Sequence, residues 1–203
     1  MARRCNDIEK RPEWLSASRH AIDFILAHGF DTDGRVFFSV TREGKPLRKR
    51  RYLFAEIFAI MAFAEYGKAA VDATILEKAK QLMRFVQEMY AKPWDAPGAL
   101  EPKVFLQTRP MRGHSMAMIQ INTLQILRQA DSSGSPLPYE RMIDAQIDEA
   151  FRYFVKPEMK ALLETVGPNG EYLGDTPEGR CVNPGHAIET AWFIMAEAKR
   201  RGD

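Results

Sequence analysis

Six segments of this 203-residue chain carry apolar residues at helical spacing, and the segments alternate between two kinds. One kind is apolar on a single face, which is typical of a half-exposed helix; the other is apolar nearly all round, which is typical of a helix packed on most sides. The half-exposed kind covers residues 12–28, 72–91 and 139–155, and the buried kind covers residues 52–66, 115–128 and 185–199. The pattern predicts an all-α fold.

The three buried segments recur at a roughly constant interval. They are centred near Phe58, Asn122 and Thr190, which are 64 and then 68 residues apart. Helical hairpins in two concentric layers would produce this alternation, with inner helices packed on both sides and outer helices on one. An α/α toroid, or an arc of one, explains the pattern better than an open solenoid, whose layers are both partly exposed.

The connections that lead into the buried segments are long, whereas the reverse connections, such as YGKAAVDA, are short. Residues 31–51 contain VFFSV and the turn signal REGK, which predict a β-hairpin. In residues 162–185, LLETV and EYL flank GPNG and predict a second hairpin. The third long connection, residues 94–114, is rich in proline. We expect these loops to gather at one mouth of the toroid and to form a functional face.

The stretch GRCVNPGHAIETAWF, residues 179–193, places a histidine at the start of the last segment. Asn183 suits the N-cap and Pro184 the first helical position, which puts His186 at about the third. The positive end of the helix dipole disfavours a protonated ring there, and a neutral imidazole can act as a base. Glu189 shares the same face, so its carboxylate can hold the ring. The pattern predicts a proton-transfer pair; a capping histidine with a satisfied neighbour is the alternative.

Charge, cysteine content and the lack of long apolar runs indicate which classes of protein this sequence does not fit. A net charge of +2 does not suggest nucleic acid. Cys5 and Cys181 form neither a disulfide framework nor a CxxC pair, so free thiols in a reducing compartment are expected. The N-terminal residues lack the apolar run of a signal peptide, and no run is long enough to span a membrane. No metal site is expected, because no second ligand sits at ligand spacing to His186. These features predict a cytoplasmic protein without a membrane partner.

The chain resembles the N-acylglucosamine 2-epimerase family in KRPEWL, FSVTREGKPLRKRRYLFAEIFAI, LLETVGPNGEYL and GRCVNPGHAIETAWF. The resemblance runs across essentially the whole chain. Cellobiose 2-epimerases carry a shorter GHxIE-type motif and lack the basic GKPLRKRRY segment, so the N-acyl-sugar branch fits better. The family fold is an (α/α)6 barrel, which implies a partial (α/α)6 barrel here, with short β-hairpins in the loops on one face.

The resemblance implies the interconversion of N-acetylglucosamine and N-acetylmannosamine. The sugar opens, a base removes the C2 proton to give an enolate, and a second group returns a proton to the opposite face. Two histidines fill these roles in the family. Carried over to this sequence, His186 and its acidic helper Glu189 are the catalytic residues, and Asn122 and Glu56 are the substrate-binding residues.

Each substrate-binding assignment has a structural alternative. Asn122 could be a helix-interior side chain that bonds to a neighbour. Glu56 is costly to bury unless it is paired, so an ion pair with one of Arg48, Lys49, Arg50 or Arg51 is an equally good interpretation. The RKRR run itself is typical of a solvated edge. No cofactor is expected to be required, and ATP enters only as an effector that the family resemblance implies.

An (α/α)6 barrel needs twelve helices, and six are predicted. We therefore expect residues 1–203 to form a single incomplete domain that lacks the N-terminal helix and the C-terminal half, with its second histidine. Exposed inner-helix faces and little or no activity of the chain alone are expected. Full-length members are expected to be homodimers that bind a small sugar. The alternatives are an epimerase or aldose–ketose isomerase for unsubstituted sugars such as cellobiose or mannose, and a non-catalytic helical interaction module.

Overall fold

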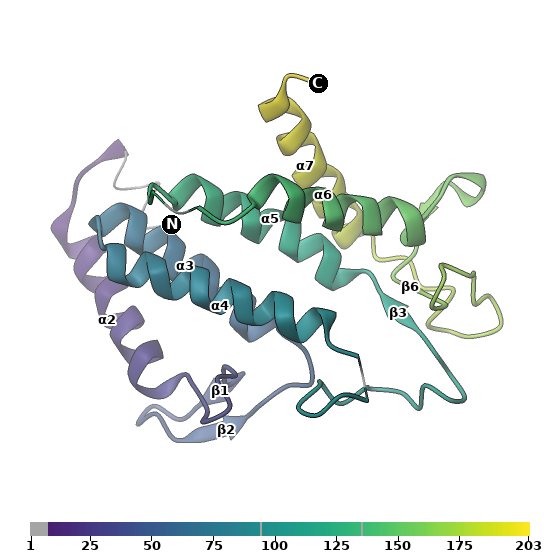
Figure 1. Ribbon diagram of the computed structural model, residues 1–203, viewed down its shortest axis with the longest axis horizontal. Helices are drawn as coiled ribbons and strands as arrows, with labels where there is room; N and C mark the ends of the chain where they lie inside the picture. Colours follow the sequence, from purple (N-terminus) through teal and green to yellow (C-terminus); the bar gives the residue numbers. More distant parts are fainter. Residues whose placement is uncertain (1–7, 94, 135) are drawn as a thin grey trace. The chain divides into compact units, whose positions relative to one another are not determined.

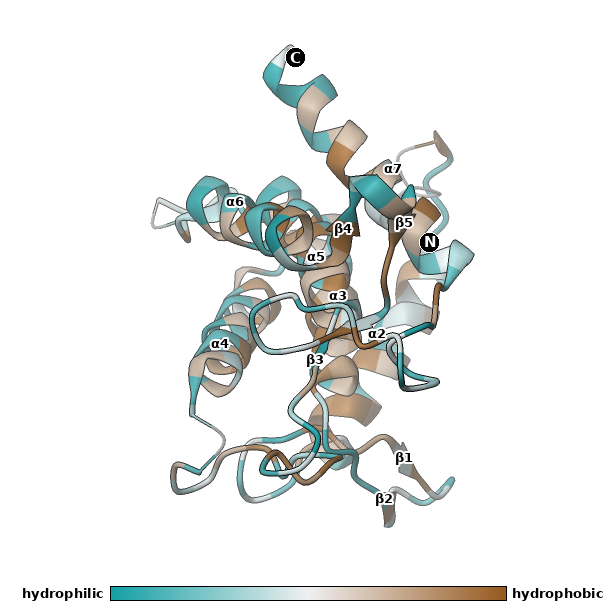
Figure 2. Ribbon diagram, turned by 90° about the vertical axis from the view of Figure 1, so that its right-hand side faces the viewer, coloured by the Kyte–Doolittle hydropathy of each residue, from teal (hydrophilic) through white to brown (hydrophobic). Residues whose placement is uncertain are grey.

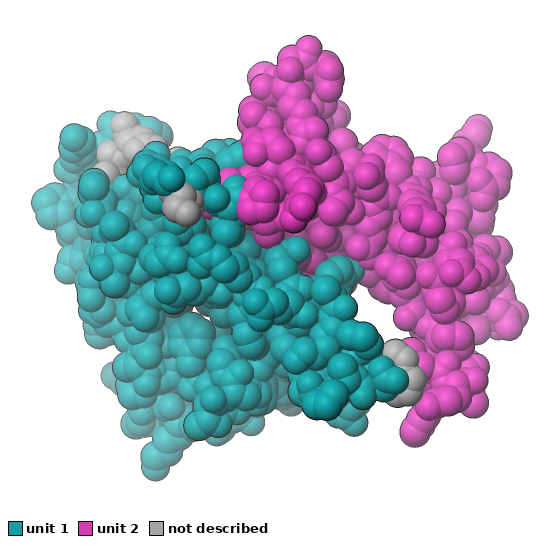
Figure 3. Space-filling model, viewed as in Figure 1, with its two compact units in different colours: residues 1–101, 126–137 teal, residues 102–125, 138–203 magenta. Residues whose placement is uncertain are grey.

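The computed structural model describes residues 8–93, 95–134 and 136–203 (Figure 1). Cys5 lies outside the described residues. The chain divides into two compact units, one of residues 1–101 with 126–137 and one of residues 102–125 with 138–203 (Figure 3). Within the described ranges, no helix is long and apolar enough to cross a membrane.

All six predicted helices are present, and all but the fifth, α6, have ends close to the expected positions. They are α2 (Pro12–His28), α3 (Phe54–Ala70), α4 (Ala73–Ala91), α5 (Ser115–Ala130), α6 (Tyr139–Glu149) and α7 (Pro184–Arg201). The all-α class is confirmed, because the strands that the structure describes are only two or three residues long.

One predicted helix ends early. The segment predicted as 139–155 is α-helical only to Glu149 and then widens into a π-helical turn, η1 (Ala150–Phe154). Phe154 at its end is fully buried against Leu163 and Val166. The chain then continues as strand β4 (Val155–Lys156) rather than as helix. Periodicity over the segment correctly predicts the burial of Ile143, Ala150 and Phe154, but Phe151 is 55% exposed, and periodicity cannot show that the helical hydrogen bonding changes.

The first unit is built on α3, which packs against α2 and α4. The apolar side chains of α3 are largely buried, as predicted for an inner helix, and α4 buries one face. Asp72 caps α4, since its carboxylate accepts hydrogen bonds from the backbone N–H groups of Thr74 and Ile75. The fully buried core residues on these two helices are Ile57, Ile60, Phe63, Ala64, Ala79, Met83 and Val86.

Two polar residues inside the apolar helix α5 are explained by their partners in the second unit. Gln120 donates a hydrogen bond from Nε2 to the side-chain oxygen of Gln146 on α6, at 3.2 Å. Gln125 donates to the backbone carbonyl of Phe193 on α7, at 2.9 Å. Buried amides are tolerated when they are hydrogen-bonded in this way. Both glutamines therefore link α5 to its neighbouring helices.

Helix α7 differs from the sequence prediction. Residues 185–199 were expected to be buried nearly all round, but only Thr190, Phe193 and Glu197 are buried. Ile188, Trp192 and Met195 are 70%, 57% and 62% exposed, and apolar patches alternate with polar ones along the helix (Figure 2). The prediction of all-round burial is wrong in this chain, because burial depends on packing partners and only one stripe of α7 has them among the described residues.

The first predicted hairpin is confirmed, since β1 (Ser39–Val40) pairs with β2 (Pro46–Arg48) in antiparallel fashion. The second is wrong in its pairing. Strand β5 (Ala161–Leu162) pairs with β4, and β6 (Thr165–Val166) pairs with β3 (Arg112–Gly113). A short 3-10 helix, η2 (Pro157–Met159), lies between β4 and β5 in the chain.

The GPNG turn forms as predicted, but it does not close a hairpin. Gly167 donates a backbone hydrogen bond to Glu171 at 2.8 Å, and Gly170 adopts a φ of 92°, which favours glycine. The EYL residues after the turn form no strand. Residues 161–166 already pair with β4 and then with β3, so their hydrogen-bonding groups are used by other partners.

Candidate active site at the start of α7

The predicted N-cap of α7 is present and fixes the backbone of His186. Asn183 has an extended backbone, and its side chain accepts a hydrogen bond from the His186 N–H at 3.3 Å. Pro184 begins the helix, so His186 occupies the third helical position. The first turn of α7 is therefore held from its capping residue, with the imidazole projecting from it.

The carboxylate that contacts the His186 ring belongs to Glu164, between β5 and β6. The two carboxylate oxygens lie 3.0 and 2.9 Å from Nδ1. Both side chains are partly exposed, at 32% for His186 and 21% for Glu164. Glu189, the predicted partner, is exposed one turn later, and within the described ranges no hydrogen bond joins it to His186. The predicted ring contact is therefore corrected from Glu189 to Glu164.

Glu164 is itself held by its backbone. Its N–H donates a hydrogen bond to the carbonyl of Cys181 at 3.1 Å, and its carbonyl accepts one from the N–H of His114 at 3.0 Å. Sequence reasoning missed this residue because it lies 22 positions before His186. The available signal was an acidic residue between the apolar Leu163 and Val166, in a segment that otherwise suits a buried strand.

A second histidine, His114, is buried near His186 and is linked to it through Thr190. Its side chain is fully buried, its ring packs edge-on against Phe154 at 5.2 Å, and its Nε2 lies 3.2 Å from the hydroxyl of Thr190. That hydroxyl donates to the carbonyl of His186 at 2.7 Å. Burial, with a smaller contribution from the charge of nearby His186, lowers the pKa of His114 from 6.5 to about 4. His114 is therefore neutral at neutral pH.

The lowered pKa of His114 predicts a loss of stability in mild acid. Between about pH 6.5 and 4 the unfolded chain binds a proton at this residue and the folded chain does not, so the free energy of unfolding falls as the pH falls. At pH 4.5 the loss should reach roughly 2–3 kcal/mol. Urea unfolding of the wild type and His114→Leu at pH 7 and 4.5 checks this. Equal pH dependence of the two proteins would contradict it.

Among the described residues, neither Asn122 nor Glu56 forms a hydrogen bond with His186. Asn122 is half-buried on α5, and among the described residues no hydrogen bond links it to His186. Glu56 belongs to the first unit, where its side chain is completely buried. One of its carboxylate oxygens, Oε2, is buried without a hydrogen-bond partner among the described residues, and a contact between Glu56 and substrate stays a prediction.

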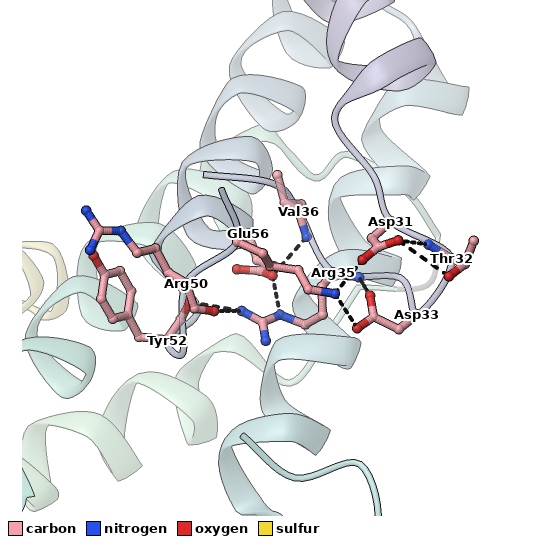
Figure 4. Close-up of polar contacts among 9 residues, drawn as sticks. Asp31, Thr32, Asp33, Arg35, Val36, Arg50, Tyr52 and Glu56 are labelled. Carbon is pink, nitrogen blue, oxygen red and sulfur yellow. Dashed lines mark hydrogen bonds and ion pairs between the residues drawn. The ribbon is translucent and has the colours of Figure 1, made fainter. Parts of the chain in front are cut away.

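The partner of Glu56 is Arg35 rather than a member of the predicted RKRR run. The Arg35 guanidinium lies 2.5 Å from the Glu56 carboxylate and donates to the backbone carbonyls of Arg50 and Tyr52 (Figure 4). The same carboxylate oxygen accepts the Val36 N–H at 2.9 Å. A buried ion pair is therefore present, and its partner comes from outside the run because the loop before β1 folds back onto α3.

A cavity of about 490 Å³ in the first unit is bordered by cationic side chains, by the acidic Asp33 and Glu101, and by the apolar side chains of Phe85 and Met89. Arg50 stacks over Phe38 at 4.3 Å, and its Nε atom is buried without a partner among the described residues. An unpaired buried donor of this kind suits an anionic ligand. The cations that border the cavity are Arg35, Lys49, Arg50, Arg51 and Lys92.

The sequence is similar to known sugar epimerases along nearly its whole length. The family model described as N-acylglucosamine 2-epimerase (GlcNAc 2-epimerase) matches residues 2–203. The N-acylglucosamine 2-epimerase of Bos taurus is 30% identical over 198 residues, which cover 96% of this chain and 45% of the relative. A cellobiose 2-epimerase of Dictyoglomus turgidum is 25% identical over 196 residues, which cover 91% of this chain and 48% of the relative. The chain spans about half the length of the curated relatives that it matches.

The solved structure of a cellobiose 2-epimerase from Bacillus thermoamylovorans matches with a TM-score of 0.79 and 18% identity, over 100% of this chain and 53% of that one. This likeness concerns the fold alone. Such neighbours are (α/α)6 barrels, so the partial (α/α)6 arrangement predicted from the alternating helices is confirmed. The exposed apolar residues on α7 are consistent with a chain that spans half of such a barrel.

Proposed function

This chain belongs to the N-acylglucosamine 2-epimerase family, and on that premise we propose that it is the part of a sugar 2-epimerase that carries one of two proton-transfer groups, His186. The proposed reaction interconverts N-acetylglucosamine and N-acetylmannosamine. The relatives are carbohydrate epimerases, which are isomerases. The observation that supports the proposal is the partly exposed imidazole of His186, whose Nδ1 is hydrogen-bonded to the Glu164 carboxylate.

The chemistry needs a base beside C2 of the open-chain sugar. The C2 proton is acidic because the electrons left on its removal delocalise onto the C1 aldehyde as an enolate. His186 takes this proton in the proposed mechanism and so forms an imidazolium. Return of a proton from the opposite face inverts C2 and regenerates the aldehyde. Glu189, exposed on the same helix, remains a candidate for contact with the substrate hydroxyls.

His114 does not supply the second proton. It is fully buried and its Nε2 faces Thr190. The proposal gives no part in the reaction to His20 and His28, which lie on α2 in the first unit. The proposal therefore assigns the second proton-transfer group to the part of the barrel that these 203 residues do not cover, and expects little or no epimerisation by the chain alone.

This expectation predicts a clear difference between two proteins. The chain alone should give no C2 exchange of N-acetylglucosamine in deuterated water above the uncatalysed rate. A fusion to the C-terminal half of the bovine relative, called the extended chain below, should restore both exchange and epimerisation. Proton NMR of the C2 signal follows both, and circular dichroism checks that each protein is folded. Robust turnover by the 203 residues alone would refute the assignment of the second proton-transfer group to a part of the barrel outside this chain.

A substrate panel separates the alternatives. N-Acetylglucosamine, cellobiose and mannose are offered to the extended chain, and the basic GKPLRKRRY segment favours the N-acyl sugar by family resemblance. Epimerisation of cellobiose, or conversion of mannose to a ketose, would favour an enzyme for unsubstituted sugars. A folded extended chain that acts on none of the three would favour the non-catalytic interaction module.

We further propose that the cationic cavity in the first unit is the position of the nucleotide effector that the family resemblance implies. Arg35, Lys49 and Arg51 already face carboxylates of the protein. Among the described residues, Arg50 and Lys92 face no carboxylate; Lys92 donates only to the backbone carbonyl of Pro97 at 3.3 Å, so these two are proposed to meet added phosphate. A volume of about 490 Å³ is in the range of small-ligand pockets.

Arg50→Ala and Lys92→Ala are each expected to weaken ATP binding by about tenfold, the effect of losing one charge-assisted hydrogen bond. Lys68→Ala, an exposed lysine on α3, is the matched control and should leave binding unchanged. Isothermal titration calorimetry with ATP and with inorganic triphosphate measures the affinities. Equal weakening by all three substitutions would indicate general charge attraction instead of a site.

A further inference from the structure

We propose that Glu164 is a positioning residue that holds His186 in the Nδ1–H tautomer, so that Nε2 is the atom that exchanges a proton with the substrate. The structural part of this inference stands on the geometry around His186. Its consequence for the reaction rests on the proposed function.

The tautomer follows from which groups can donate. An ionised carboxylate only accepts hydrogen bonds, and a neutral imidazole carries a single N–H. Nδ1 of His186 lies 2.9 and 3.0 Å from the two oxygens of Glu164, so Nδ1 must be the donor. The lone pair then resides on Nε2, which is the basic atom. When Nε2 takes a proton, the resulting imidazolium already faces a negative charge at Nδ1.

The backbones of Glu164 and His186 are each held by hydrogen bonds that need no substrate. The backbone of Glu164 is bonded on one side to Cys181 and on the other to His114. Its neighbours in the chain, Leu163 and Val166, are buried in the cluster around Phe154. The point from which the Glu164 side chain reaches the ring is therefore fixed, as a group that orients a catalytic side chain requires.

His186 is held independently of Glu164. The Asn183 side chain accepts its N–H, and the Thr190 hydroxyl donates to its carbonyl. These contacts fix the backbone and leave the ring free to rotate about its side-chain bonds. Of the described residues, Glu164 alone makes a hydrogen bond to the ring, so removal of its carboxylate should release the ring without unfolding the helix start.

The first experiment measures the tautomer directly and needs no substrate. The chain labelled with 15N-histidine is examined by long-range 1H–15N NMR at about pH 8, above the ordinary imidazole pKa of about 6.5. His186→Gln identifies the His186 signals by their loss. The wild type should show the Nδ1–H tautomer. Glu164→Ala should shift the population towards Nε2–H, and Glu164→Gln, whose side-chain oxygen can still accept, should retain Nδ1–H.

Glu189→Ala is the matched control, an acidic residue on the same helix that should leave the tautomer unchanged. An Nε2–H tautomer in the wild type overturns the proposal. So does an unchanged Nδ1–H population in folded Glu164→Ala. If Glu164→Ala does not fold, the wild-type and Glu164→Gln spectra still decide, because Nε2–H in either one contradicts the predicted hydrogen bond.

The second experiment measures the consequence for the reaction in the extended chain. Glu164→Ala should lower kcat for C2 exchange by about 10–100-fold with little change in KM, as for loss of a group that orients a ligating or reacting histidine. Glu164→Gln should recover part of kcat. An unchanged kcat in Glu164→Ala would overturn the positioning role. A confirmed tautomer with an inactive extended chain would instead refute the proposed function and leave the structural assignment standing.

Discussion

His186→Gln in the extended chain is expected to lower the rate of C2 proton exchange by about 10²–10⁴-fold, the usual contribution of a positioned general base. Glutamine keeps a polar side chain near Glu164 but has no basic nitrogen, so the substitution removes the proton acceptor rather than the packing. The Asn183 cap bonds the backbone N–H of this residue and is unaffected by the change. The substrate KM should change little, because the base acts in the transition state.

The matched control is His20→Gln, an exposed histidine on α2 in the first unit, which should leave exchange unchanged. Exchange is followed by loss of the C2 proton signal, and thermal unfolding monitored by circular dichroism confirms equal folding. Activity of folded His186→Gln within a few-fold of the unsubstituted protein would remove His186 from the mechanism. The family fold would be unaffected by that outcome.

The position of His186 could be predicted from sequence because the signals that fix it are local. Asn183 and Pro184 precede it directly, and together they specify where a helix begins. The helices themselves were predicted for the same reason, since each is defined by apolar spacing within one continuous segment. The inner position of α3 and α5 also followed, because their side chains are apolar on most faces.

The residue that contacts the ring could not be predicted in this way. Helical spacing favoured Glu189, which lies three positions away, over Glu164, which is brought there by the pairing of β6 with β3. Strands of two residues carry almost no signal of which partner they choose. The burial of α7 was overestimated because its composition reflects a packing environment that the described residues only partly provide.

Glu56→Ala is expected to lower the free energy of unfolding by about 3–5 kcal/mol, the usual cost of breaking a buried ion pair from one side. The substitution leaves the Arg35 guanidinium, only 8% exposed, without its carboxylate. It also removes the acceptor of the Val36 N–H. The loop between α2 and β1 should therefore detach from α3. Urea unfolding gives the free energy, and hydrogen exchange of the Val36 amide reports the local opening.

Removing both charges of the pair should lower the free energy of unfolding by less than removing the Glu56 carboxylate alone. The double variant Arg35→Met, Glu56→Met leaves no uncompensated charge, so its loss of stability should be smaller than that of Glu56→Ala. Glu88→Ala, an exposed acidic residue on α4, is the control and should change stability by no more than about 0.5 kcal/mol. A Glu56→Ala protein as stable as this control would show that the pair is not structural, and Glu56 would return as a candidate for substrate contact. A large loss that the double variant relieves would instead show that the ion pair of Glu56 with Arg35 anchors the loop on α3.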